Sequence, residues 1–380
     1  MICFEKEATS VERQNGVSLP LMSLVVLFYN QSQYVESAVA GALSQDWQNC
    51  EIVFSDDCST DDTLEKILTA VKRYEGPHRV VVNSRSVNCG IGAHVKDAFS
   101  LCNGDWVVVQ GGDDVSVSNR VSVIAGYAKN NKSVSAVGVG AIAINEAGDR
   151  CGDSKTVEEP VIYRCCRNQT GIACTLDPGK DASICLITGA MAAYRKDVVE
   201  VAPIPEDIVA EDVFLTHRAA LVGDIAFLPE KCVLQRICST SLSRGGKGSK
   251  TRKERQRFRK RISRMAYLSF DALLTECDGY DFEVGEGYKE YIAFQRATLL
   301  LHCFALGPLS RESFTAYAQA FSMARKGNSI YQILNAAAKR GVGCRCFMLL
   351  LASMVHSVCK KSGHLCKRFW CGVAESEKMI

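Results

Sequence analysis

The chain has 380 residues, of which 47% are hydrophobic and 23% charged, with a formal net charge of only +3. This is the composition of an ordinary globular protein, and the length allows about one to three domains. The small net charge argues against binding of nucleic acid over the whole surface, and only 8 prolines exclude long proline-rich linkers.

Nineteen cysteines would suggest disulfide bonds in a short secreted chain. The first residues, MICFEKEATSVERQNG, lack the apolar core of a signal peptide, so we expect reduced thiols in a cytoplasmic protein. The set His356, Cys359, His364 and Cys366 fits no common zinc spacing. The run FMLLLASMV at 347–355 is far shorter than the roughly 20 residues that cross a bilayer, so we expect no transmembrane span.

Short apolar runs alternate with helical patterns from Leu24 onward. Strands are predicted at 23–30, 51–57, 79–84, 105–112 and 135–145, with helical spacing at 32–45, 60–74 and 92–102. For the second helix, Ser59 or Thr60 is the expected N-cap, with Asp61 and Asp62 at its positive end. This alternation predicts an open α/β domain with a mostly parallel sheet flanked by helices.

The pattern loosens after residue 145 and returns at 183–200, 210–223 and 224–236, and the apolar spacing looks helical from about 251 to 360. The expected organisation therefore has four parts. These are an N-terminal extension at 1–21, an α/β domain at 22–243 with halves 22–115 and 116–243, a basic flexible segment at 244–264, and a C-terminal helical region at 265–380.

Polar side chains fall at the carboxyl ends of the predicted strands, where open α/β sheets bind ligands. One carboxylate pair at a strand end is more often a solvated turn or a helix cap, but Asp57 and Asp114 recur at the ends of two predicted strands. Clustered carboxylates suit Mg2+ or Mn2+, which also binds phosphate oxygens. The sequence therefore predicts a phosphorylated substrate, and it contains neither GxxxxGK[ST] nor a GxGxxG after the first strand.

Two long segments together resemble family 2 glycosyltransferases. They are SLVVLFYNQSQYVESAVAGALSQDWQNCEIVFSDDCSTDDTLEKI and NCGIGAHVKDAFSLCNGDWVVVQGGDD. The family pattern has a strand ending in Tyr-Asn, a helix closing with Ser-x-x-x-Gln, a strand ending in Asp-Asp-Gly-Ser-Thr-Asp, and a later aspartate motif. The likeness spans residues 22–240 and implies a GT-A fold that transfers a sugar from a nucleotide donor.

The resemblance implies roles for single residues in the nucleotide-binding half. Tyr29, Asn30, Asp57 and Arg85 match nucleotide-binding positions, and an ionised Asp57 can accept the N3 hydrogen bond of uracil or thymine. In the aspartate motif, Asp113 is expected near the ribose and Asp114 as the direct ligand of Mg2+ or Mn2+. The motif departs from the common form because Gly111 stands where an acid is frequent.

In the acceptor-side half, Asp212 matches the general base of the family, and Glu211 precedes it. From the residues alone this pair is more often a helix cap. Gly189 and Ala190 resemble the segment that lines the acceptor side, and Arg236 stands where an arginine could meet the diphosphate; a surface arginine is the alternative. A single base implies inversion, and the absence of Gln-x-x-Arg-Trp after residue 236 favours transfer of one sugar per encounter.

The expected function is an inverting, metal-dependent, non-processive glycosyltransferase acting from a UDP-sugar, or secondly a dTDP-sugar. The acceptor is expected to be a glycan or a lipid-linked molecule in assembly of surface polysaccharide, such as capsule or lipopolysaccharide. Two alternatives stay open, a catalytically degenerate scaffold or binding protein and a sugar nucleotidyltransferase. We expect no nucleic-acid partner, and a homo-oligomer remains open.

The segment RGGKGSKTRKERQRFRKRISR at 244–264 carries many lysines and arginines. Such a segment most often forms a solvated surface. The alternatives are a mobile lid and a patch that faces a membrane. Together with the apolar and basic C-terminal helices, it leaves open a peripheral contact with the inner face of the cytoplasmic membrane.

Overall fold

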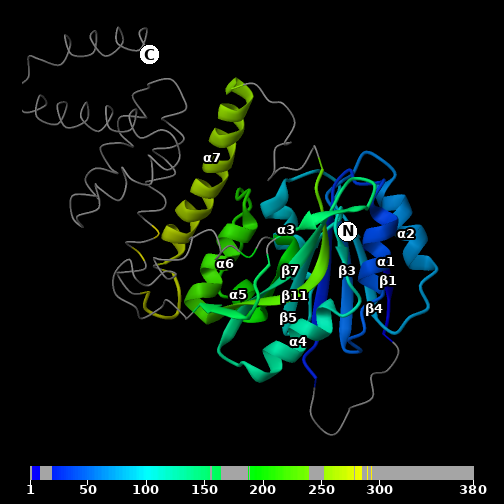
Figure 1. Ribbon diagram of the computed structural model, residues 1–380, viewed down its shortest axis with the longest axis horizontal. Coiled ribbons are helices and arrows are strands. Elements are labelled where there is room, and N and C mark those ends of the chain that lie inside the picture. Colours follow the sequence, from blue (N-terminus) through cyan, green and yellow to red (C-terminus); the bar gives the residue numbers. More distant parts are fainter. Residues whose placement is uncertain are drawn as a thin grey trace, which may run out of the picture. The chain divides into compact units, whose positions relative to one another are not determined.

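The computed structural model describes residues 2–8, 19–154, 156–163, 187, 189–238, 252–277, 279–284, 289 and 292, with only the backbone given for 252–263. The chain divides into two compact units, Met1–Ser249 with Leu268–Tyr291, and Lys250–Tyr267 with Ile292–Ile380. The first unit is an α/β domain, in which helices flank a twisted sheet (Figure 1).

The strands have the following bounds: β1 Ile2–Lys6, β2 Met22–Phe28, β3 Cys50–Asp56, β4 Arg79–Ser84, β5 Trp106–Gly111, β6 Val115–Ser116, β7 Val134–Ile144, β8 Arg150–Asp153, β9 Val161–Tyr163, β10 Ala192–Arg195 and β11 Asp224–Arg236. The helices are α1 Val35–Leu43, α2 Thr63–Lys72, α3 Ile91–Ser100, α4 Arg120–Asn130, α5 Lys196–Glu200, α6 Glu211–Val222 and α7 Arg252–Glu276, with a short 3-10 turn, η3, at Gly189–Met191.

The strands follow the order β1-β4-β3-β2-β5-β10-β7-β11-β6 across the sheet, with β8 on β7 and β9 on β11. Strands β4, β3, β2 and β5 are parallel, and their pairing sets Phe28 opposite Asp56 and Asp56 opposite Ser84. Strand β10 lies antiparallel between β5 and β7, whereas β11 is parallel to β7. The carboxyl ends of the four parallel strands therefore meet at one edge.

Both faces of the central strands are buried, which explains why their sequences are continuous apolar runs rather than alternating ones. On β2, the residues Met22, Leu24, Val26 and Phe28 belong to one core cluster that also contains the inner faces of α1, α2 and α4. The residues between them point to the opposite face, where α3 contacts β2 and β3. Helix α3 also contacts α6, so helices that lie far apart in the chain share this layer.

The predicted fold class is confirmed, and the structure corrects two local expectations. Helix α2 begins at Thr63, not after Ser59 or Thr60, because Asp61 accepts the Thr63 amide at 3.1 Å while Ser59 donates to Asp56 in the preceding loop. Residues 2–6 of the expected N-terminal extension form β1, which pairs antiparallel with β4.

Helix α7 runs across residue 264, where the sequence led us to separate a flexible segment from a helical region. Within the described residues, we find no helix long and apolar enough to span a membrane. The nine cysteines described there are all free thiols. His356, Cys359, His364 and Cys366, the apolar run at 347–355 and most of the C-terminal region lie outside the described residues.

Candidate active site

Tyr29 and Asn30 follow β2, where Tyr29 is exposed and Asn30 is hydrogen-bonded to a neighbouring loop. Tyr29 is 47% exposed, which makes it one of the few large apolar side chains open to solvent in the described domain. Asn30 has a φ of 52° and accepts the Thr60 amide on Oδ1 at 2.7 Å. Its own amide donates to Oγ of Ser59 at 2.8 Å. Asn30 therefore ties together the loops after β2 and β3, while Tyr29 is free to meet a planar ligand.

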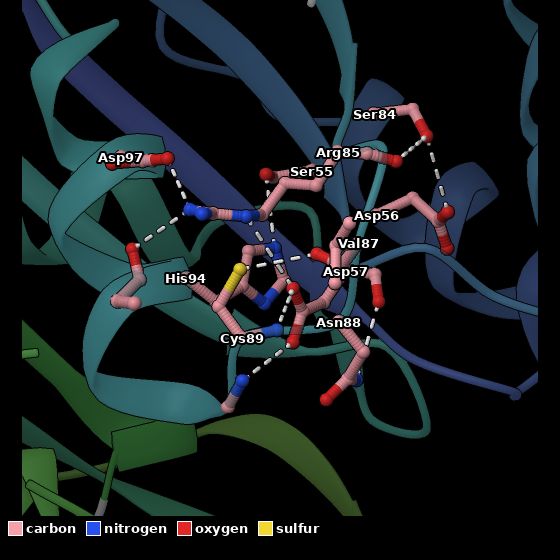
Figure 2. A network of polar contacts seen from close by, with 12 residues as sticks. Ser55, Asp56, Asp57, Ser84, Arg85, Val87, Asn88, Cys89, His94 and Asp97 are labelled. Atoms are coloured by element: carbon pink, nitrogen blue, oxygen red, sulfur yellow. Dashed lines mark hydrogen bonds and ion pairs between the residues drawn. The ribbon is translucent and has the colours of Figure 1, made fainter. Parts of the chain in front are cut away.

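Asp57 follows β3 and is buried at the amino end of α3. Its two carboxylate oxygens accept the main-chain amides of Cys89 and Gly90, each at 3.2 Å (Figure 2). Gly90 is the N-cap of α3. Its φ is 82°, a backbone conformation that residues other than glycine rarely adopt. The loop before α3 therefore fixes the orientation of the carboxylate predicted to bind a base.

Arg85 lies between the same loop and α3. Its Nη1 donates to the Asp97 carboxylate and to the Ala93 carbonyl, and its Nε stands 3.6 Å from Oδ1 of Asp57 (Figure 2). Because the far end of the guanidinium is bound to α3, Arg85 presents a fixed positive charge beside Asp57. The structure thus brings together the base-binding residues that the sequence predicted.

Sequence reasoning missed His94, which lies behind Asp57 on the inner face of α3. Its Nε2 is 2.9 Å from Oγ of Ser55, and Asn83 donates to the same hydroxyl at 3.2 Å. Burial lowers the pKa of His94, although Asp57 and Asp56 act in the opposite direction. The only sign of His94 in the sequence is its position among the apolar residues of the predicted helix. A histidine with no role in the site would occupy the same kind of position in the core.

The two carboxylates after β5 lie side by side in a buried setting. Oδ1 of Asp114 accepts the main-chain amide of Arg236 at 2.7 Å. Burial, followed by the charge of Asp113, raises the pKa of Asp114 to about 8. Burial also raises the pKa of Asp113. Two neighbouring buried carboxylates repel each other when both are ionised, so this setting favours either protonation of one of them or the binding of a cation.

The absence of a side chain at Gly111 leaves room between the two carboxylates. A Cβ added there would lie 3.0 Å from Oδ1 of Asp113 and 3.2 Å from Oδ2 of Asp114. No group of three or more His, Cys, Asp or Glu that could hold a metal occurs in the described part of the chain. Two carboxylates still fit Mg2+ or Mn2+, because these ions commonly bind one or two carboxylates and take their other oxygens from water and phosphate.

Arg236 is bound mainly to main-chain oxygens. Its Nε donates to the Asp113 carbonyl at 2.9 Å, and its Nη1 donates to the carbonyls of Asn145 and Glu146 at 2.9 and 3.0 Å. The guanidinium also lies 4.5 Å from the ring centre of Tyr34. Arg236 thus joins the end of β11 to the aspartate motif and to the turn after β7. A surface arginine, the alternative from the sequence, is excluded by its burial.

A second acidic pair begins α6. Oδ1 of Asp212 accepts the Val213 amide at 2.8 Å, and Oδ2 accepts the Gly189 amide at 3.3 Å. A Cβ added to Gly189 would meet Oε1 of Glu211 at 2.8 Å, so glycine permits this approach. Burial, followed by the charge of Asp212, raises the pKa of Glu211 to about 8. Helix α6 starts from Ala210 without a side-chain cap, so the pair lies inside the first turn and does not form the helix cap that was the alternative from the residues alone.

The second acidic pair reaches the same end of the sheet through η3 and β10. Strand β10 pairs antiparallel with β5, with Ala193 opposite Val108. Gly189 and Ala190 precede β10, so the antiparallel register carries them towards Gly111 at the end of β5, and η3 contacts β5. The sheet therefore brings all the residues predicted from the sequence to one edge, in three groups around Asp57, Asp114 and Asp212.

The mostly parallel sheet flanked by helices is the GT-A fold, and solved glycosyltransferase structures share it. The S. aureus TarS 1-349 structure in complex with UDP-GlcNAc has a TM-score of 0.55 and 16% identity, and the match covers 88% of this chain and 92% of that one. The mannosyltransferase PcManGT from Pyrobaculum calidifontis, in complex with GDP-Man and Mn2+, has a TM-score of 0.50, 15% identity and coverage of 90% and 88%.

Residues 23–201 match the family described as glycosyl transferase family 2, and the domain built around them belongs to that family. EpsE of Bacillus subtilis strain 168, named as a glycosyltransferase, is 27% identical over 131 residues, which are 34% of this chain and 46% of EpsE. The chain spans about half the length of the first curated relatives that it matches, 46% and 58%. The expected family and fold are thus confirmed, while Asp212 and Arg236 lie beyond the matched residues.

Proposed function

We propose that the chain is an inverting, metal-dependent glycosyltransferase that moves one sugar from a nucleotide diphosphate to a hydroxyl group. The observation that carries this proposal is the meeting of three acidic groups at one sheet edge, since each suits a different part of such a reaction. Binding of UDP-GlcNAc by TarS and of GDP-Man with Mn2+ by PcManGT, as named for those structures, supports a nucleotide-sugar donor and a metal.

For the donor base, the proposal assigns Tyr29 to stacking and Asp57 to hydrogen bonding. Asp57 already accepts two amides, and each carboxylate oxygen has a second lone pair for the N3 hydrogen of uracil or thymine. Cytosine lacks that hydrogen. We therefore expect a UDP-sugar first and a dTDP-sugar second, with Asp113 near the ribose.

For the diphosphate, Asp114 would bind Mg2+ or Mn2+ directly beside Gly111, with Asp113 next to it. Such an ion, when bound, offsets the negative charge that grows on the leaving diphosphate. The raised pKa of Asp114 supports this assignment, because a cation favours the ionised carboxylates that burial and repulsion disfavour. Arg236 keeps Asp114 in place through its main-chain amide, and its Nη2 is the atom that we assign to the diphosphate.

For the acceptor, Asp212 is the proposed general base. It removes the proton of the acceptor hydroxyl while that oxygen attacks the anomeric carbon from the face opposite the diphosphate, which inverts the configuration. The raised pKa of Glu211 keeps that neighbour protonated near neutral pH, so we assign the negative charge of the pair to Asp212. Gly189 and Ala190 would allow the acceptor close to the backbone.

We further propose non-processive transfer to a glycan or lipid-linked acceptor in surface-polysaccharide assembly, on the support of the family membership and the residues after Arg236. Contact with a membrane through the basic segment, location in the cytoplasm and assembly into a homo-oligomer stay predictions. A degenerate scaffold domain is the second candidate, and retention of Asp57, Asp114 and Asp212 counts against it.

The test is a calorimetric titration of UDP, dTDP, GDP and CMP into the full chain with and without Mn2+, followed by measurement of nucleotide release from a panel of UDP- and dTDP-sugars. We expect metal-dependent binding of UDP or dTDP and slow release of that nucleotide from one donor. Binding without turnover of any donor would favour the scaffold candidate. Failure of every nucleotide to bind in the presence of Mn2+ would overturn the nucleotide site itself.

A further inference from the structure

Helix α6, which carries Glu211 and Asp212, begins without a side-chain cap at Ala210. The Ala210 carbonyl accepts the Phe214 amide at 3.2 Å, the first hydrogen bond of the helix. The same carbonyl also accepts the hydroxyl of Ser269 at 2.8 Å. Ser269 is fully buried and belongs to α7. Ser269, which lies 59 positions further along the chain, therefore fixes the first turn of α6, from which Glu211 and Asp212 project.

A second contact between α6 and α7, further along both helices, is an ion pair. Arg218 of α6 is fully buried, and its guanidinium meets the carboxylate of Glu276 at the end of α7. Arg218 also donates to the carbonyls of Ala202 and Pro203, at 3.0 and 3.1 Å. A buried guanidinium needs a countercharge, so α6 depends on the end of α7 to supply it.

Apolar contacts join these two points. The ring centres of His217 and Phe270 lie 4.7 Å apart in an edge-to-face arrangement, and Leu273 is fully buried. Ser269, Leu273 and Glu276 are spaced at i, i+4 and i+7, so they share one face of α7. All these residues lie in the first compact unit. One face of α7 from Ser269 to Glu276 thus lies against α6, while Thr275 on another face is exposed.

We infer that this part of α7 is a positioning element for the general base, with Ser269 as its positioning residue. The inference rests on the proposed role of Asp212. Asp212 is oriented by the Val213 amide of its own helix and by a long, 3.3 Å bond from Gly189. Its direction therefore follows the first turn of α6, which Ser269 anchors, and a displacement of about 1 Å can slow a reaction on the order of 100-fold.

The experiment compares Ser269→Ala with Ser269→Thr, which keeps the hydroxyl. Thr275→Ala is the matched control, because Thr275 lies on the same helix, is exposed and donates only within that helix. The readouts are kcat and donor KM for nucleotide release from the donor that the wild type uses, and the Kd of UDP with Mn2+. Loss of a positioning contact should lower kcat without changing how the donor binds.

We expect Ser269→Ala to lower kcat about tenfold, with donor KM and the Kd of UDP within about twofold of the wild type. Ser269→Thr should recover most of the loss, and Thr275→Ala should behave as the wild type. An unchanged kcat in Ser269→Ala would overturn the inference. A fall of kcat together with donor affinity would do the same, because it would show a general loss of structure.

A failure of the proposed function is seen separately, in the wild type, as absence of nucleotide binding or of turnover. In that case hydrogen exchange of the amides at 211–216 decides the inference about Ser269. Exchange should accelerate in Ser269→Ala and return towards the wild-type rate in Ser269→Thr, while the amides of α3 stay unchanged. Unchanged exchange at 211–216 in Ser269→Ala would overturn it.

Discussion

The main-chain amide of Arg236 donates a 2.7 Å hydrogen bond to Oδ1 of Asp114, across 122 positions of the chain. The contact uses one carboxylate oxygen and leaves Oδ2 on the side of Gly111. Strand β11 therefore sets the direction of the carboxylate that we assign to the metal. A replacement at position 114 keeps the bond from the Arg236 amide only if its side chain still offers an oxygen at this place, as Asn does.

Replacement of Asp114 by Asn should abolish the effect of Mn2+ on UDP binding. Asn keeps an oxygen for the Arg236 amide but removes the charge that attracts the ion, so UDP should bind at least about tenfold more weakly with Mn2+ and equally without it. Calorimetry with and without Mn2+ measures both. Asp207→Asn, at an exposed position, is the control. A metal effect of normal size in Asp114→Asn would remove Asp114 from the site.

Replacement of Asp212 by Asn should separate binding from chemistry. The amide keeps an acceptor for the Val213 or Gly189 amide but cannot take a proton, so kcat should fall on the order of 10²- to 10⁴-fold. The Kd of UDP with Mn2+ should stay that of the wild type. Steady-state release of nucleotide and calorimetry give the two numbers. Turnover within a few-fold of the wild type would show that another group is the base.

The stability of the folded chain should depend on pH through Glu211. Its pKa rises from 4.5 to about 8 on folding, so between those values the folded chain holds a proton that the unfolded chain has lost. Stability from this group is complete below about pH 4.5 and declines as the pH rises towards about 8. Glu211→Gln does not titrate and should lose less stability over that interval.

Urea unfolding at about pH 5 and about pH 8 measures the difference. The exposed Glu230→Gln is the control, since its loss of stability between the two pH values should match that of the wild type. An equal pH dependence in Glu211→Gln and the wild type would contradict the assignment of the raised pKa to this carboxyl.

Gly111→Ala should weaken the metal site while the fold persists. The added carbon would lie 3.0 and 3.2 Å from carboxylate oxygens of Asp113 and Asp114, closer than ordinary contact, so both would shift. We expect UDP binding in Mn2+ to weaken about tenfold or more. Gly126→Ala in α4, where an added carbon meets nothing within 4 Å, should instead stabilise the chain by about 0.5–1 kcal/mol.

The interior of the sheet could be predicted because apolar runs in a parallel sheet are bounded by polar residues at both ends. The predicted strands 23–30 and 79–84 correspond to β2 Met22–Phe28 and β4 Arg79–Ser84. The acidic residues after β3 and β5, among them Asp57 and Asp114, then followed from one rule about strand direction. In contrast, β1 is a short strand whose partner β4 lies more than seventy residues away, as the pairing of Lys6 with Val80 shows, and no local pattern indicates such a pairing.

Parts of the candidate site escaped prediction for a similar reason. His94, Ser269 and Glu276 each have an identifiable place on a helix, but spacing reveals only the face that is buried and not the group that covers it. The residue that meets Ser269 is a main-chain carbonyl, which any residue type provides. The antiparallel insertion of β10 between β5 and β7 was likewise hidden, although it carries Gly189 towards Gly111.

Strand β11 joins two of the three acidic groups, since it starts directly after α6 at Asp224 and ends at Arg236 beside Asp114. Its pairing with β7 shifts register between Asp224 and Ile225 and again between Leu228 and Val233, and it is regular from Val233 to Arg236. One residue of a strand spans roughly 3.3 Å, more than the length of the bond to Asp114. A deletion after Val233, where the pairing is regular, would therefore draw the Arg236 amide away from Asp114 and break the bond that orients this carboxylate.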